Sequence, residues 1–236
     1  MKDKKALVVF SGGQDSTTCL FWAREHYGSA CAVTFDYGQR HRREIESARR
    51  IASEFGFTHE IIDLGALFAG LSPLTDHSRA VDKYEPGQPL PGGLASTFVP
   101  GRNILFATIA ANRAYVLDCD AIVLGVAQQD FGGYPDCRQD FIDKMEAALA
   151  SGLDRHIKIE TPLMHLSKKQ TVELAVTLPN CMQALAYSTT CYEGHFPPCG
   201  TCHSCILRQK GFAEAGVDDP LLGNSKFSAS EVTHNA

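Results

Sequence analysis

Basic residues are not in excess in this sequence of 236 residues, in which 22 Lys and Arg stand against 27 Asp and Glu. The formal net charge is -5. Proteins that bind nucleic acid usually carry a basic surface, so this balance disfavours direct binding of duplex nucleic acid or tRNA. Internal repeats and low-complexity tracts are absent as well. These absences argue against a nucleic-acid-binding chain and against a repeat architecture.

Long apolar runs are also missing. The N-terminal stretch MKDKKALVVFSGG holds only a short apolar run, too short for the core of a signal peptide or for a membrane span. We therefore expect a cytoplasmic protein without membrane contact. In that reducing compartment the nine cysteines are not expected to pair as disulfides, so their spacing needs another explanation.

Short apolar runs alternate with helical patterns along most of the chain, which predicts an α/β fold with a doubly wound, parallel, five-stranded sheet. We expect one domain over residues 1–236, with a small C-terminal segment of about 186–236 that carries clustered cysteines. Ligands of such sheets lie at the carboxyl ends of the strands. The expected strands are 6–10, 31–35, 60–64, 121–125 and 157–159, and the expected helices are 16–26, 39–55, 104–116, 141–151 and 171–178.

The segment Ser11-Gly-Gly-Gln-Asp-Ser16 lies between the first predicted strand and helix. Glycines there allow backbone N–H groups to turn inward as an anion-binding nest, and the helix start adds its own unpaired N–H groups. The common phosphate loop G-x-x-x-x-G-K-[ST] requires a lysine that is missing here. A plain strand-to-helix turn with a Ser or Asp cap is the alternative interpretation.

Four cysteines near the C-terminus have the spacing of a metal site. Cys191, Cys199, Cys202 and Cys205 lie within fifteen residues, and the last three follow a C-x-x-C-x-x-C pattern. Four thiolates satisfy tetrahedral Zn²⁺ and leave no open position, so the pattern predicts a structural zinc site. Unligated thiols and a redox C-x-x-C pair remain alternatives.

Charged residues at predicted strand ends and helix starts are candidates for substrate or phosphate contacts. Arg102 opens a helix and can bind a phosphate or carboxylate with two donors, whereas Asn103 can be a simple N-cap. Asp130 and Asp136 follow the fourth strand and can accept the N–H groups of a guanine-like edge, although Asp136 can equally cap the next helix. Lys168 can neutralise a leaving pyrophosphate, or it can be an ordinary exposed lysine.

The loop SGGQDS resembles the SGGxDS motif of the PP-loop ATP pyrophosphatases, which cleave ATP between the α- and β-phosphates and transfer AMP to a substrate oxygen. Within that superfamily, the chain resembles the 7-cyano-7-deazaguanine synthase family of the queuosine pathway. The stretches stand in the same order over nearly the whole chain: VVFSGGQDSTTCL, VTFDYGQRHR, TFVPGRNILF, GYPDCR, ETPLM and the C-x-x-C-x-x-C cluster. The departures from the family's pattern are mild: the segment VAQQDFGG, the long loop 65–101, the segment around Pro179–Ala186 and the tail after Gly216.

The resemblance implies a PP-loop, adenine nucleotide hydrolase-like fold, a homodimer, structural Zn²⁺ and ATP with Mg²⁺. It implies that 7-carboxy-7-deazaguanine is adenylated on its carboxylate, that ammonia gives an amide, and that a second ATP turns the amide into a nitrile. Asp15, Arg102 and Lys168 are then the predicted catalytic residues, and Asp130 and Asp136 the predicted substrate contacts. The predicted nucleotide-binding residues are Phe10, Ser11, Gly12, Gly13, Gln14, Asp15, Ser16, Thr17, Thr18, Cys19 and Leu20.

Two other functions fit parts of the pattern. A PP-loop tRNA thiolase shares the glycine loop, but the acidic balance and the absence of an appended RNA-binding domain disfavour it. A zinc-stabilised nucleic-acid-binding module with a vestigial nucleotide site requires a basic stripe that the sequence does not show.

Overall fold

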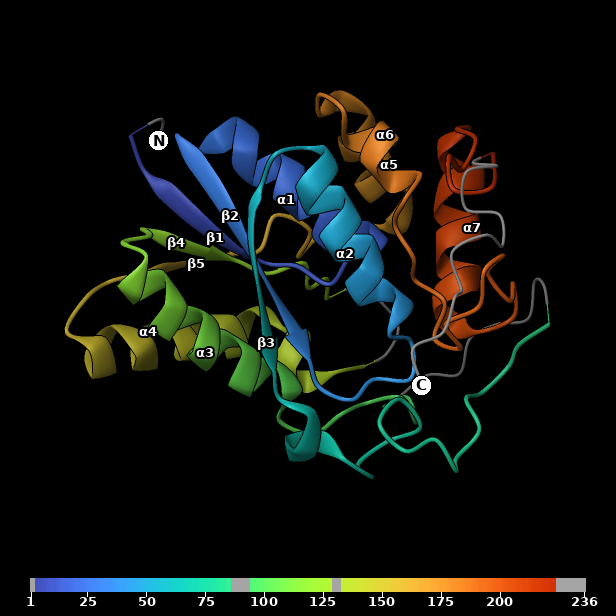
Figure 1. The fold of residues 1–236 in the computed structure, drawn as a ribbon, viewed down its shortest axis with the longest axis horizontal. Coiled ribbons are helices and arrows are strands. Elements are labelled where there is room, and N and C mark those ends of the chain that lie inside the picture. The colour runs from blue at the N-terminus through green and yellow to red at the C-terminus, as the bar shows by residue number, and fades with distance from the viewer. Residues whose placement is uncertain (1–2, 86–93, 129–132, 224–236) are drawn as a thin grey trace.

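The five expected strands form one parallel sheet in the order β3-β2-β1-β4-β5 (Figure 1). This computed structural model describes residues 3–85, 94–128 and 133–223. Both the strand count and the parallel pairing confirm the fold class expected from the alternating pattern. The strands are β1 (Lys5–Val9), β2 (Ser29–Asp36), β3 (Thr58–Asp63), β4 (Ala121–Val123) and β5 (Lys158–Glu160).

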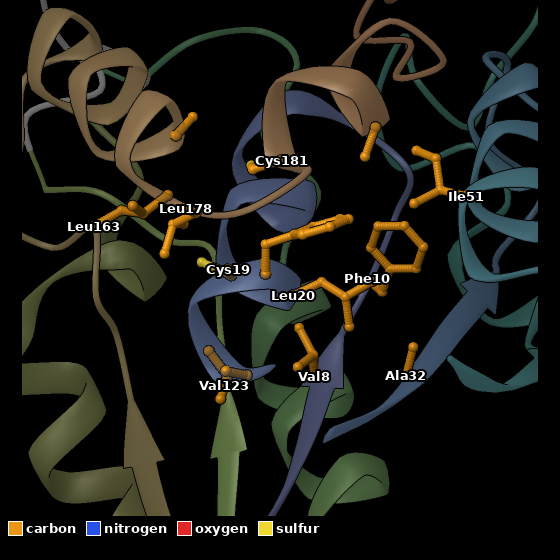
Figure 2. Close-up of a cluster of buried hydrophobic side chains, with 14 of the residues drawn as sticks. Val8, Phe10, Cys19, Leu20, Ala32, Ile51, Val123, Leu163, Leu178 and Cys181 are labelled. Atoms are coloured by element: carbon orange, nitrogen blue, oxygen red, sulfur yellow. The ribbon is translucent and has the colours of Figure 1, made fainter. Parts of the chain in front are cut away.

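Helices cover both faces of the sheet because the strands are apolar on both faces. Val8 of β1 and Val123 of β4 point into one layer with Leu20, beneath the first group of helices (Figure 2). Leu7, the neighbour of Val8, points to the opposite layer. The first group is α1 (Gln14–His26), α2 (Arg43–Glu54), α5 (Lys168–Thr177) and α6 (Cys181–Leu185), and the second is α3 (Arg102–Val116) and α4 (Gln139–Leu153).

The expected helix 39–55 begins later than the sequence pattern indicates, at Arg43. The side chain of Gln39 accepts a hydrogen bond from the backbone N–H of Tyr37 at 2.8 Å, and the N–H of Arg40 donates to the carbonyl of Leu74 at 2.9 Å. The first bond folds Gln39 back toward the end of β2 and the second ties Arg40 to the following long connection, so these residues do not form a helical turn.

One long helix in the cysteine-rich segment was not anticipated. Helix α7 (His203–Ala215) begins directly after Cys202 and packs against α5. Gly211 permits this approach, because a Cβ at that position would lie 2.9 Å from Cβ of Lys168. The sequence also did not indicate α6 or the short 3-10 helices η1 (Gly65–Phe68) and η2 (Pro135–Cys137). The capping box at Ser167 and Gln170, by contrast, is present as predicted.

Successive strands are added first on one side of β1 and then on the other, and this switch of strand order creates a crevice for a ligand. From β1 the chain runs through α1 to β2 on one side, and it later returns through α3 to β4 on the other side of β1. Ligands of open α/β sheets bind in the crevice at the carboxyl ends of the two strands that flank such a switch point. In the part of the chain that the structure describes, no helix has the length and apolar character needed to cross a membrane.

Candidate active site

A cavity of about 280 Å³ opens at the carboxyl ends of β1 and β4. Its floor is the loop Ser11–Ser16 and the residues that follow β4, and α3, α5, α7 and the segment 190–192 form its walls. Predicted site residues that line it are Phe10, Ser11, Gly13, Gln14, Asp15, Ser16, Arg102 and Lys168. The fold therefore brings together residues that lie more than 150 positions apart.

The glycine loop is held in shape by its own hydroxyl groups. Ser16 Oγ accepts from the backbone N–H of Ser11 at 3.1 Å and lies 3.1 Å from Ser11 Oγ. Ser11 Oγ in turn accepts from the N–H of Gly13 at 3.2 Å. Gly12 has a φ of +86°, and a Cβ there would lie 2.3 Å from the carbonyl oxygen of Glu44 in α2. Glycine is thus required for both the turn and the close approach of α2.

Helix α1 begins at Gln14 with its N-terminus toward the cavity and without a side-chain cap. The first N–H groups of a helix lack partners within the helix and carry a partial positive charge, which favours a bound anion. In the described chain, three buried side-chain atoms at this helix start have no hydrogen-bond partner: Gln14 Nε2, Asp15 Oδ1 and Thr17 Oγ1. Such atoms are costly unless a ligand satisfies them.

The remaining predicted nucleotide-binding residues serve the core instead of the cavity. Thr18, Cys19 and Leu20 are fully buried and are not among the residues that line the cavity. Thr18 donates its hydroxyl to the carbonyl of Gln14 at 3.0 Å. Burial, with the charge of Asp15 second, raises the pKa of the Cys19 thiol, so this cysteine is a neutral core residue.

Lys168, the first residue of α5, reaches the glycine loop. Its Nζ lies 2.6 Å from Oδ2 of Asp15, and both side chains line the cavity. The glycine loop contains no lysine, whereas the common phosphate loop has one in its own sequence. Here the ammonium group beside the loop belongs to Lys168 of α5.

Arg102 lies in the opposite wall, at the start of α3. Its Nη1 donates to the hydroxyl of Tyr37 at 3.5 Å, and its guanidinium lies 6.0 Å from the ring centre of Tyr134. Among the described residues, no carboxylate forms an ion pair with it. A guanidinium that faces a cavity without a carboxylate partner has donors that can bind an anionic ligand group.

The two predicted substrate carboxylates have different outcomes. Asp130 lies outside the described residues. Asp136 is buried beneath the cavity wall, where its Oδ2 accepts from the backbone N–H of Asn103 at 3.3 Å. Burial raises the pKa of Asp136. Its carboxylate holds the start of α3, the helix that presents Arg102.

Cys191, Cys199, Cys202 and Cys205 form a cluster that can hold a metal ion, because their sulfur atoms all lie within 4.8 Å of one another. Tetrahedral Zn²⁺ with Zn–S bonds of about 2.3 Å needs sulfurs that are close neighbours in this way. The backbone N–H of Cys202 donates to Sγ of Cys199 at 3.3 Å, the kind of outer contact that supports a thiolate ligand. Hydrogen bonds with the thiols of Cys202 and Cys205 lower the pKa of Cys191, and hydrogen bonds with Cys191 and Cys202 raise the pKa of Cys205.

Several residues of the cavity wall are not among the predicted site residues, and for one of them, His41, the sequence leaves an ordinary turn and a site role equally open. Tyr37, His41 and Glu44 come from the stretch DYGQRHRRE after β2, whose position at a strand end is a signal for them. Thr190 and Tyr192 flank Cys191 and carry no such signal, because only the folded chain brings them opposite the glycine loop.

Comparisons with known proteins agree over most of the chain. The family profile described as Queuosine biosynthesis protein QueC matches residues 5–216. The 7-cyano-7-deazaguanine synthase of Chromobacterium violaceum is 52% identical over 230 residues, 96% of this chain and 97% of that protein. The protein of the same name from Gloeobacter violaceus is 52% identical over 224 residues, 92% of this chain and 95% of that protein. A 4-thiouridine synthetase solved with RNA and bound ATP shares the fold, with a TM-score of 0.50, 18% identity, and coverage of 93% of this chain and 52% of that chain.

Proposed function

The chain belongs to the queuosine biosynthesis protein QueC family, and from this membership we propose that it is an ATP-dependent 7-cyano-7-deazaguanine synthase. It converts 7-carboxy-7-deazaguanine and ammonia into the nitrile, with release of AMP and pyrophosphate. The single observation that carries the ATP-dependent part is the loop Ser11–Ser16 at the switch point, with unsatisfied buried polar atoms at the helix start behind it.

The glycine loop and the start of α1 bind the pyrophosphate end of ATP in this proposal. The hydroxyl groups of Ser11 and Ser16 and the N–H groups at the start of α1 supply donors for phosphate oxygens. Asp15 Oδ1, which is buried and has no hydrogen-bond partner in the described chain, would be a ligand for Mg²⁺. Bound Mg²⁺ would offset the negative charge of the phosphates.

Lys168 stabilises the leaving pyrophosphate. Its ammonium group stands beside Asp15 in the cavity, where a positive charge lowers the free energy of a departing anion. The Asp15 carboxylate keeps this ammonium in place before the nucleotide binds.

Arg102 binds the carboxylate of the deazaguanine substrate. Arg102 lines the cavity together with the rings of Tyr37, Phe106 and Tyr134. Aromatic rings pack well against a flat heterocycle such as the deazaguanine ring. The guanidinium and the glycine loop occupy the same cavity, so a substrate carboxylate held at Arg102 can face the α-phosphate of ATP.

The reaction proceeds in two ATP-dependent halves. The substrate carboxylate attacks the α-phosphorus, pyrophosphate leaves, and ammonia then displaces AMP from the acyl adenylate to give the amide. In the second half the amide oxygen attacks the α-phosphorus of another ATP, pyrophosphate leaves and the amide nitrogen loses one proton. Loss of AMP together with the second nitrogen-bound proton then leaves the nitrile. No protein nucleophile is needed, since positioning and charge stabilisation suffice.

We further propose that the four cysteines hold one structural Zn²⁺ per chain, because four thiolates close the coordination shell. The whole chain is proposed to form one domain, since α7 packs directly on α5. A cytoplasmic location is supported by the nine cysteines, none of which is paired in a disulfide. A homodimer rests on the family resemblance, and light scattering of the purified protein tests it.

Mass spectrometry tests the proposed function directly. We expect the purified protein to form a nitrile from 7-carboxy-7-deazaguanine, ATP and ammonium, with AMP and pyrophosphate released. AMP formed only with tRNA and a sulfur donor would instead assign a thiolase activity. Tight, salt-sensitive RNA binding without turnover would assign a nucleic-acid-binding module.

A further inference from the structure

His41 is a buried wall residue of the cavity that the proposed roles above do not use. It is 3% exposed and lies just before α2. On the chain it ends the stretch DYGQRH, which follows β2 at the carboxyl edge of the sheet. The segment that leads from Thr190 through Tyr192 to Gly194 covers it, and the ring centres of His41 and Tyr192 are 6.0 Å apart.

His41 is paired with a carboxylate in the first turn of the helix that follows it. Its Nε2 lies 3.4 Å from Oε2 of Glu44, which belongs to α2. The other ring nitrogen, Nδ1, has no hydrogen-bond partner among the described residues. A carboxylate at one imidazole nitrogen fixes the tautomer and stabilises the protonated ring, which leaves the other nitrogen as a proton acceptor.

Glu44 also brings this pair close to the glycine loop. Its Oε1 lies 3.5 Å from the point that a Cβ on Gly13 would occupy, and Cγ2 of Thr190 lies 3.4 Å from the same point. His41, Glu44 and the phosphate-binding loop therefore share one end of the cavity.

The proposed reaction requires a proton acceptor at this place. When ammonia attacks the acyl adenylate, its nitrogen becomes positively charged and must lose a proton before AMP departs. Asp15 is engaged with Lys168 at 2.6 Å. The phenols of Tyr37, Tyr134 and Tyr192 are weak acids here, since burial raises the pKa of all three. The imidazole of His41 is paired with a carboxylate at Nε2, and its Nδ1 has no hydrogen-bond partner among the described residues, so Nδ1 of the neutral ring is placed to accept a proton.

We infer that His41, held by Glu44, accepts the proton from the ammonia nitrogen in the amide-forming step, an inference that rests on the proposed function. The nitrogen lone pair forms the bond to the acyl carbon, and the N–H electron pair stays on nitrogen as the proton moves to the imidazole. AMP leaves with the electrons of the acyl C–O bond. The products are the amide, AMP and imidazolium, which Glu44 stabilises until the proton reaches solvent.

Charged groups around His41 are arranged on three sides. Arg40 and Glu44 are charged neighbours of His41 along the chain. Arg40 forms an ion pair with Glu193, in the segment that covers His41, at 3.3 Å. The covering segment also contributes the phenol of Tyr192. Across the cavity lie Asp15 and Lys168, already joined to each other. Glu44 is thus the only one of these charges that pairs directly with His41 among the described residues.

Separate measurement of the two chemical steps tests the inference. Hydroxylamine is a much weaker base than ammonia and is mostly unprotonated at neutral pH, so it traps the acyl adenylate as a hydroxamate without a protein base. For His41→Gln we expect hydroxamate formation to stay within about threefold of the wild type. Ammonia-dependent amide formation should fall by about 10²-fold or more, the range typical of a lost general base. Glu44→Gln should show the same selectivity with a smaller loss.

His156→Gln is the matched control, because His156 also pairs with a glutamate, Glu146 at 3.0 Å, but is exposed and far from the cavity lining. It should leave both steps unchanged. Equal losses of hydroxamate and amide in His41→Gln would overturn the inference in favour of a role in packing or nucleotide binding. If the wild type itself forms neither hydroxamate nor amide from 7-carboxy-7-deazaguanine, the proposed function fails instead, so the two failures are distinguishable.

The pH dependence provides a second readout. The rate of amide formation, expressed per free ammonia, should fall toward low pH in the wild type because protonated His41 cannot accept a proton. That decline should be absent in His41→Gln and retained in His156→Gln. A decline of the same shape in both variants would contradict the assignment, and it would do so even if His41→Gln were partly unstable.

Discussion

Lys168 Nζ and Asp15 Oδ2 lie 2.6 Å apart although 153 positions separate the two residues along the chain. The pair joins the first turn of α1 to the first turn of α5 across the cavity. In the proposed function this ammonium serves the glycine loop as an internal lysine serves the common phosphate loop. Tertiary structure, not local sequence, places it beside the loop.

Replacement of Lys168 by Met should reduce the kcat of AMP formation by about 10²- to 10³-fold, the loss typical of one missing transition-state donor. The fold should persist, because Met retains the apolar stem that packs near Gly211. Pyrophosphate release measures the rate, and circular dichroism checks the fold. Lys169→Met is the control, since Lys169 is exposed and pairs with Glu173 at 3.6 Å. Equal rates in the two variants would contradict the role of Lys168.

The sheet could be predicted from the sequence, whereas the lining of the cavity could be predicted only in part. Continuous apolar runs such as Ala6–Val9 identify buried parallel strands from local sequence alone. Helix α7 is not predicted from the sequence, because Cys205 of the cysteine cluster lies in its first turn and the helix follows Cys202 directly, so the cysteine spacing obscures its helical period. Tyr192 enters the cavity wall only through long-range packing, which local sequence does not encode.

Gly12→Ala should destabilise the protein more than Gly56→Ala does. Both glycines have positive φ angles, +86° and +72°, so both substitutions strain the backbone. Only at Gly12 does the new Cβ meet backbone atoms, at 2.3 Å from the carbonyl oxygen of Glu44, whereas nothing lies within 4 Å at Gly56. The difference in the free energy of unfolding should be about 1–3 kcal/mol, the cost of overpacking. Urea unfolding of the two variants measures this difference. Equal unfolding midpoints would show that α2 shifts to accommodate the new Cβ without a cost in stability.

Arg102→Lys should raise the KM for the carboxylate substrate and leave the KM for ATP nearly unchanged. Lysine keeps the charge but loses the two parallel donors that bind a carboxylate, so kcat/KM should fall by about 10- to 100-fold. Arg113→Lys, on the same helix and paired with Glu60 at 2.9 Å, is the control. Steady-state kinetics with each substrate varied in turn make the measurement. A parallel rise in both KM values would instead place Arg102 at the nucleotide.

Cys202→Ser should remove the metal and loosen the C-terminal segment. The wild type is expected to contain one zinc per chain by elemental analysis, and the variant almost none, because a serine hydroxyl is a poor ligand for Zn²⁺. Cys119→Ala, a buried cysteine outside the cluster, should retain the metal. Hydrogen exchange over residues 186–212 should accelerate in Cys202→Ser and on treatment with a chelator. Full zinc content in Cys202→Ser would rule out the four-sulfur site.

His59 should make stability depend on pH in a defined window. Burial, with a contribution from Arg49, lowers the pKa of His59 to about 4. Its Nε2 lies 2.7 Å from Oγ1 of Thr34, whose hydroxyl donates to the carbonyl of Phe10 directly before the glycine loop. Nε2 must therefore carry the proton of the neutral ring, because the hydroxyl has only one hydrogen to donate.

A histidine with a lowered folded-state pKa binds fewer protons when folded than when unfolded. Its contribution to stability is thus complete above about pH 6.5, the ordinary value for histidine, and is lost as the pH falls toward 4. His59→Gln keeps a donor for Thr34 but cannot titrate, so the wild type should lose more stability than this variant between pH 7 and pH 4.5. His77→Gln, at an exposed position, should follow the wild type. Urea midpoints of the three proteins at both pH values measure this difference, and identical shifts in all three would show that His59 titrates normally in the folded protein.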